Sequence, residues 1–105
     1  MNPKTDFDIQ TLSLGDSKFS TKLQLIKPKI KQIQYIGDIN LLFQPILGIV
    51  GPRKSTDYGV QVLHKLFEKA KSYRMVTISG MAEGIDQLCH NLSIQHKIPT
   101  IAVLG

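Results

Sequence analysis

Residues 46–59 read Ile-Leu-Gly-Ile-Val-Gly-Pro-Arg-Lys-Ser-Thr-Asp-Tyr-Gly, an apolar run followed by a polar loop. The apolar run is too short for a buried helix and is rich in branched side chains, which predicts a strand inside a sheet. A helical pattern follows the loop, because apolar side chains recur there on one face. That face comprises Val62, Leu63, Leu66, Phe67 and Ala70. We therefore expect a strand, a glycine turn and a helix in succession.

The loop between this strand and this helix has the features of an anion site. Ser55, Thr56 and Asp57 can each cap the helix, because a side-chain oxygen there accepts a hydrogen bond from an unpaired backbone N–H. Free amides and the positive end of the helix dipole then converge in front of the helix, where Arg53 and Lys54 add two cations. Many turns of this kind carry no ligand, so the loop alone leaves both interpretations open.

The loop matches neither of two familiar phosphate motifs. Residues 51–59 lack the Gly-Lys-Ser/Thr ending of a Walker A loop. They also lack the Gly-x-Gly-x-x-Gly spacing of a dinucleotide fingerprint, because Pro52 and Arg53 follow Gly51 directly. A nucleotide cofactor is therefore not expected.

The composition is that of an ordinary globular chain with a basic balance. The chain has 105 residues, enough for one small domain, and a formal net charge of +5 that favours a polyanionic partner. Cys89 is the single cysteine, which fits a reducing compartment. No apolar run is long enough to cross a bilayer, and residues 1–18 lack the hydrophobic region of a signal peptide. We expect a cytoplasmic protein with no membrane contact.

Residues 1–45 predict a lead-in of short elements. Phe7, Ile9, Leu12 and Leu14 come close to alternating, which indicates a short strand before the turn at residues 15–16. A helical turn or two follows up to residues 27–28. Residues 30–36 then alternate apolar and polar side chains, which predicts a second strand.

Residues 46–105 predict a βαβαβ unit. Two further apolar runs, residues 75–79 and 100–104, follow the first strand, and a second amphipathic helix that carries Ile85, Leu88, Cys89 and Leu92 separates them. Strands that alternate with helices indicate a parallel sheet with right-handed crossovers. We expect a single, incomplete Rossmann-like domain with a three-layer α/β architecture. Both glycine-containing loops should lie at the carboxyl ends of the strands, where such sheets bind ligands.

The two loops together resemble those of the DprA/Smf family of DNA-processing proteins. The first carries Gly51-x-Arg53 and then Tyr58-Gly59, and the second carries Ser79-Gly80-x-Ala82-x-Gly84-Ile85-Asp86, with His90 one turn later. Leu14-Gly15-Asp16 and Tyr35-x-Gly37-Asp38 also fall where the family has its own landmarks, so that the resemblance runs from about Ile9 to Gly105.

The resemblance implies a Rossmann-like domain that binds single-stranded DNA without sequence preference. It implies a role in natural transformation, with the RecA recombinase and a second copy of the chain as further partners. Arg53 occupies the position of the arginine that contacts phosphate, and Asp86 and His90, at i, i+4 spacing, are expected to pair structurally. The predicted DNA-contacting residues are Gly51, Arg53, Lys54, Ser55, Tyr58, Gly59, Ser79, Gly80 and Gly84.

Two departures from the family pattern leave other functions open. Pro52 replaces a small hydroxyl residue and removes one amide donor, and the family's later strands and helices would lie beyond Gly105. One alternative is an inactive, truncated remnant. The other is a nucleotide-binding enzyme of the related phosphoribohydrolase-like fold, although its Pro-Gly-Gly-x-Gly-Thr loop is absent here. We expect no enzymatic activity, no cofactor and no metal, because the three histidines and the cysteine lack ligand spacing.

Overall fold

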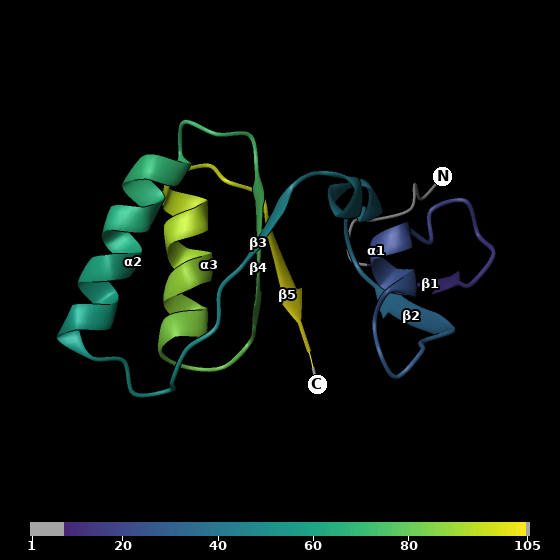
Figure 1. Ribbon diagram of the computed structural model, residues 1–105, viewed down its shortest axis with the longest axis horizontal. Helices are drawn as coiled ribbons and strands as arrows, with labels where there is room; N and C mark the ends of the chain where they lie inside the picture. Colours follow the sequence, from purple (N-terminus) through teal and green to yellow (C-terminus); the bar gives the residue numbers. More distant parts are fainter. Residues whose placement is uncertain (1–7, 105) are drawn as a thin grey trace. The chain divides into compact units, whose positions relative to one another are not determined.

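A computed structural model describes residues 8–104. The chain forms two compact units, one that ends at Phe43 and one that begins at Gln44 (Figure 1). Each unit has a hydrophobic core of its own. The sequence predicts a boundary between its lead-in and its βαβαβ unit at residues 45–46, close to this division.

The first unit is built on a two-stranded sheet. β1 (Gln10–Ser13) pairs antiparallel with β2 (Gln32–Tyr35), which confirms the two predicted strands. Phe7, which was expected to belong to the first strand, lies outside the described residues. A short helix, α1 (Thr21–Gln24), and a 3₁₀ helix, η1 (Ile39–Phe43), complete the unit. Leu12, Phe19 and Leu23 form its core.

The second unit contains a parallel three-stranded sheet. Its elements are β3 (Ile46–Gly48), α2 (Asp57–Ala70), β4 (Val76–Gly80), α3 (Ile85–Gln95) and β5 (Thr100–Val103). The strands lie in the order β3-β4-β5, and each neighbouring pair is parallel, which confirms the predicted α/β class. Both helices lie on one face of the sheet (Figure 1), as two right-handed crossovers in the same direction require. Within residues 44–104 no helix covers the opposite face of the expected three-layer arrangement.

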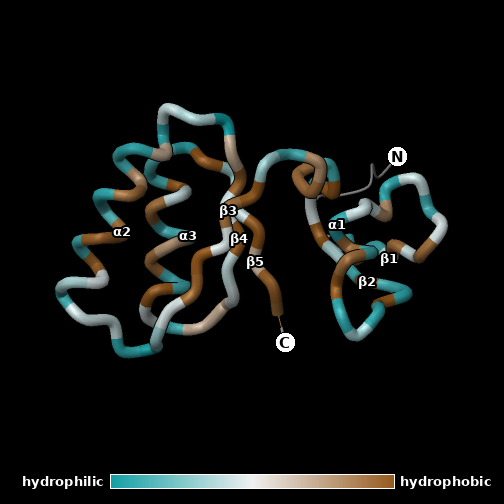
Figure 2. Tube along the Cα trace, in the orientation of Figure 1, coloured by the Kyte–Doolittle hydropathy of each residue, from teal (hydrophilic) through white to brown (hydrophobic). Residues whose placement is uncertain are grey.

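The core of the second unit lies between this sheet and the two helices. Hydrophobic residues follow the strands and the covered sides of the helices (Figure 2), and Phe67, Cys89 and Leu92 are almost completely buried. The predicted apolar face of α2 is only partly covered. Val62 and Leu66 keep exposed fractions of 45% and 38%, whereas Leu63, Phe67 and Ala70 are buried. The predicted stripe is therefore buried on one side only, because α3 and the sheet reach only that side.

Candidate nucleic-acid interface

Two loops meet at the carboxyl ends of β3 and β4. The first loop, residues 49–56, joins β3 to α2, and the second loop, residues 81–84, joins β4 to α3. The N–H of Ile85 donates a hydrogen bond to the Pro52 carbonyl oxygen at 3.3 Å. The structure thus brings the two loops together, as parallel strands that end at one sheet edge predict.

Gly84 makes this close approach possible. Its φ is +80°, a value that favours glycine, and a Cβ built on it would lie 2.3 Å from the carbonyl oxygens of both Pro52 and Arg53. No side chain fits between these backbones. Gly84 is therefore the point at which the second loop supports the first.

Three other predicted site residues make close contacts or hydrogen bonds within the protein. A Cβ on Gly51 would lie 2.5 Å from the Ile85 side chain, and one on Gly80 would lie 2.7 Å from Asp86 Oδ2. Ser79 is buried, and its hydroxyl donates to the Ile49 carbonyl oxygen at 2.6 Å. The space at Gly51 admits Ile85, while the Gly51 backbone stays exposed.

The first loop presents its polar side chains to solvent. Arg53, Lys54 and Ser55 are exposed, and Tyr58, in the first turn of α2, has an exposed fraction of 77%. Gly59 is half-buried in the same turn, close to the Thr56 hydroxyl. Two cations, a hydroxyl and an aromatic ring therefore surround the start of α2.

The amino-terminus of α2 adds backbone donors. Thr56, one of three predicted caps, is the N-cap, and its hydroxyl accepts a hydrogen bond from the Gly59 N–H at 3.0 Å. The amides of Asp57 and Tyr58 donate to no residue of the described range. Unpaired amides at the positive end of a 14-residue helix attract an anion. The Asp57 carboxylate opposes an anion beside it, which favours a position nearer Arg53.

A chain of buried and half-buried polar groups lies beneath the second loop. His90 Nε2 donates to the Gly80 carbonyl oxygen at 2.8 Å, since a carbonyl oxygen can only accept, and His90 Nδ1 lies 2.8 Å from Thr100 Oγ1. Thr77 Oγ1 links Thr100 to Ser93 at 2.8 and 2.7 Å. These bonds join α3 to β4 and β5 from the inside.

The expected pairing of Asp86 with His90 does not form among the residues described. Both imidazole nitrogens of His90 are used by the sheet, and Asp86 Oδ1 is buried without a hydrogen-bond partner. The i, i+4 spacing allows the pair, but Gly80 and Thr100 offer His90 two partners at once. This network was missed from the sequence, where isolated threonine and serine residues in apolar strands and helices give no distinct signal.

The remaining titratable groups offer no further cluster at this edge. Burial raises the pKa of the Cys89 thiol, which has no exposed surface. Residues 8–104 contain no group of three or more His, Cys, Asp or Glu side chains placed to hold a metal. In the same range no helix is long and apolar enough to cross a membrane.

A profile of the family described as DNA recombination-mediator protein A matches residues 10–105. The chain belongs to this family. It is 34% identical over 98 residues to the DNA processing protein DprA of Bacillus subtilis, covering 92% of this chain and 33% of that protein. It is also 34% identical over 71 residues to DprA of Streptococcus pneumoniae, covering 68% of this chain and 25% of that protein.

The fold of this DprA-family chain matches a solved structure of the family. The crystal structure of DprA from Streptococcus pneumoniae aligns with a TM-score of 0.85 and 29% identity, over 92% of this chain and 34% of that one. The partial Rossmann-like fold predicted from the sequence is thereby confirmed. The chain spans about a quarter to a third of the length of these relatives.

Proposed function

We propose that the first loop binds the phosphate backbone of single-stranded DNA without sequence preference. The observation that carries the proposal is the meeting, at one helix start, of exposed Arg53 and Lys54 with the unpaired amides of Asp57 and Tyr58. A guanidinium offers two parallel donors to phosphate oxygens, and helix amides add further donors. Backbone contacts of this kind carry no sequence information.

Tyr58 suits a single strand better than a duplex. Its ring is mostly exposed beside the cationic loop, and an unpaired base can stack on such a ring whatever its identity. A duplex keeps its bases stacked inside and offers this ring little. We therefore propose that Arg53 holds a phosphate while Tyr58 receives a neighbouring base.

The second loop takes a supporting part in the proposed site. Gly84 contacts the first loop, Gly80 contacts Asp86, and Ser79 bonds to Ile49. We propose that these three residues act by fixing the first loop in place. This role differs from the direct contact that the family resemblance implied for them.

The proposed role is binding without catalysis. The exposed groups of the first loop are a guanidinium, an ammonium and a hydroxyl, which orient an anion and supply no base at neutral pH. By likeness to the DprA proteins, we further propose a part in DNA processing during transformation, with RecA and a second copy of the chain as partners.

The test is a fluorescence-anisotropy titration with oligo(dT) at several salt concentrations. Arg53→Ala should weaken binding about tenfold and flatten the salt slope by about one phosphate's worth. Lys65→Ala removes one exposed charge from the middle of α2 and should have little effect. Equal losses from the two variants would mean diffuse attraction, and no binding by the unaltered chain would support an inactive remnant.

A further inference from the structure

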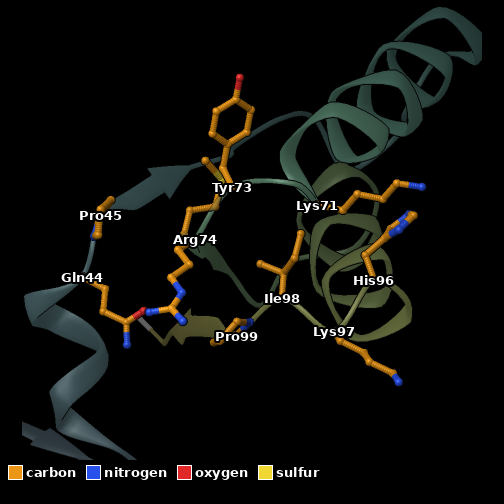
Figure 3. A pocket seen from close by; sticks show the side chains of 10 residues that line it. Gln44, Pro45, Lys71, Tyr73, Arg74, His96, Lys97, Ile98 and Pro99 are labelled. Carbon is orange, nitrogen blue, oxygen red and sulfur yellow. The ribbon is translucent and has the colours of Figure 1, made fainter.

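A basic pocket of about 590 Å³ opens at the opposite edge of the sheet from the two loops. Pro45, Met75 and Pro99 line it, and each directly precedes a strand, so the pocket lies at the amino ends of β3, β4 and β5. Figure 3 shows the Arg74 side chain extending toward Gln44 on one side, while Lys71, His96 and Lys97 project on the other. The remaining lining residues are Tyr73 and Ile98.

The pocket carries excess positive charge. Among the residues that the structure describes, no acidic side chain lines it, and the nearby carboxylate of Glu68 forms an ion pair with Lys71 at 2.8 Å, which lowers the pKa of Glu68. In the part of the chain that is described, Arg74 and Lys97 form no ion pair with an acid. Two cations therefore remain for a ligand.

Helix ends explain only part of this charge. The carboxyl ends of α2 and α3 lead into the pocket-lining segments, and each carries about half a negative charge, which attracts Lys71 and His96. The two half charges add to about one negative charge, whereas Arg74 and Lys97 bring two positive ones. Arg74 belongs to neither helix and lies two residues before β4.

Lys97 occupies a backbone position that normally holds glycine. Its φ is +58°, and the N–H of Lys97 bonds to Ile94 while that of Ile98 bonds to Ser93, the pattern of a Schellman helix end. A side chain is less favourable than glycine in this conformation. The fold thus keeps a lysine at the pocket although the turn itself favours glycine, and such outliers tend to gather at functional sites.

We propose that this basic pocket binds a second phosphate of the same single-stranded nucleic acid that occupies the first loop. The inference rests on the proposed function. β4 has five residues and rises about 3.3 Å per residue, so the two edges lie roughly 17 Å apart. Only a strand of several nucleotides can contact both edges, and a short one contacts a single edge.

Two substitutions remove the charge of the pocket with little disturbance to the fold. Lys97→Gly deletes the side chain where glycine fits best, and its free energy of unfolding should be equal to that of the unaltered chain or higher. Arg74→Gln keeps an extended polar side chain in an exposed segment. Lys65→Gln, on the exposed side of α2, makes the same change of charge away from both edges and serves as the control.

The experiment compares oligo(dT) of about four nucleotides with oligo(dT) of about sixteen, the range of single-strand site sizes. Each pocket variant should weaken binding of the long strand about fivefold and lower its salt slope, with changes below about twofold for the short strand. Arg53→Ala should weaken binding of both the short and the long oligo(dT). If this variant leaves binding unchanged, the result counts against the first loop and not against the pocket. The proposal would be overturned if the pocket variants lose equal affinity for the short and the long strand, or if Lys65→Gln loses as much affinity as they do. Full displacement of the long strand by free dTMP would also overturn it.

Discussion

The two loops at the carboxyl edge of the sheet each contain a glycine but have different surroundings. In the second loop, Gly84 lies against the backbone of Pro52 and Arg53, although Met81 and Glu83 are exposed. Just before this loop, at the end of β4, the Ser79 hydroxyl donates to the Ile49 carbonyl oxygen. In the first loop, Arg53, Lys54 and Ser55 are exposed to solvent. We propose that the second loop acts as a support and the first as the contact surface.

This difference shows that a glycine in a predicted phosphate loop has two possible uses. Its missing Cβ can admit a ligand, or it can admit another part of the same chain. At Gly84 the neighbouring atoms belong to the first loop, and at Gly51 they belong to Ile85, the first residue of α3. Substitutions in the second loop should therefore change stability, and substitutions in the first should change binding.

The largest effect is expected for Gly84→Ala. The new Cβ meets two backbone carbonyl oxygens and the residue keeps a positive φ, so the free energy of unfolding should fall by about 3 kcal/mol. Urea unfolding followed by circular dichroism measures this loss.

Gly37→Ala provides the matched control for that substitution. Gly37 also has a positive φ, of +104°, but beyond its chain neighbours no atom of the described residues lies within 4 Å of its Cβ position. Only the backbone cost of about 1 kcal/mol should appear. If both variants lose the same stability, the close contact between the loops contributes nothing.

Ser79→Ala should destabilise the chain while leaving DNA affinity unchanged. The substitution leaves the Ile49 carbonyl oxygen without its partner in a buried place, which costs about 1–2 kcal/mol. Thermal unfolding and an oligo(dT) titration of the folded variant test the two halves of this statement. A tenfold loss of affinity with unchanged stability would make Ser79 a contact residue and reverse its assignment.

Thr56→Ala should lower the free energy of unfolding by about 1 kcal/mol, because the Gly59 N–H loses its cap. Thr56 lies where the contact surface joins α2, so a small loss of affinity should accompany the loss of stability. Thr56→Ser keeps the hydroxyl and should behave like the unaltered chain in both measurements. An affinity loss in Thr56→Ser would point to a direct ligand contact instead of a cap.

The smallest effect is expected for Lys54→Gln. Lys54 is exposed, so its loss should weaken oligo(dT) binding two- to threefold, roughly, with stability changed by less than about 0.5 kcal/mol. Anisotropy titrations at low and high salt measure the effect, which should vanish at high salt. A change in stability larger than the change in affinity would place Lys54 with the supporting residues.

The sequence was sufficient to predict the sheet and the meeting of the loops. Apolar strand runs that alternate with amphipathic helices determine parallel strands, and parallel strands end at one edge. Residues 75–79 and 100–104 carried this information, and β4 and β5 lie within about one residue of them.

The proposed roles of the two loops, support for the second and ligand contact for the first, could not be predicted from the sequence. Whether Gly51 faces a ligand or Ile85 depends on how closely two loops approach in space, which no local pattern records. His90 illustrates the same limit, since its partners Gly80 and Thr100 belong to two strands that come together only when β4 and β5 pair. The basic pocket likewise combines Arg74 and Lys97 from two separate connections.

The most direct test of this division is the pattern of amide chemical-shift changes when oligo(dT) is titrated into the ¹⁵N-labelled chain. The largest changes should fall on Arg53, Lys54, Ser55, Asp57 and Tyr58, and smaller ones should reach residues 80–84 through the contact between the loops. Largest changes at residues 80–84, with the first loop unaffected, would contradict the assignment of the first loop as the contact surface.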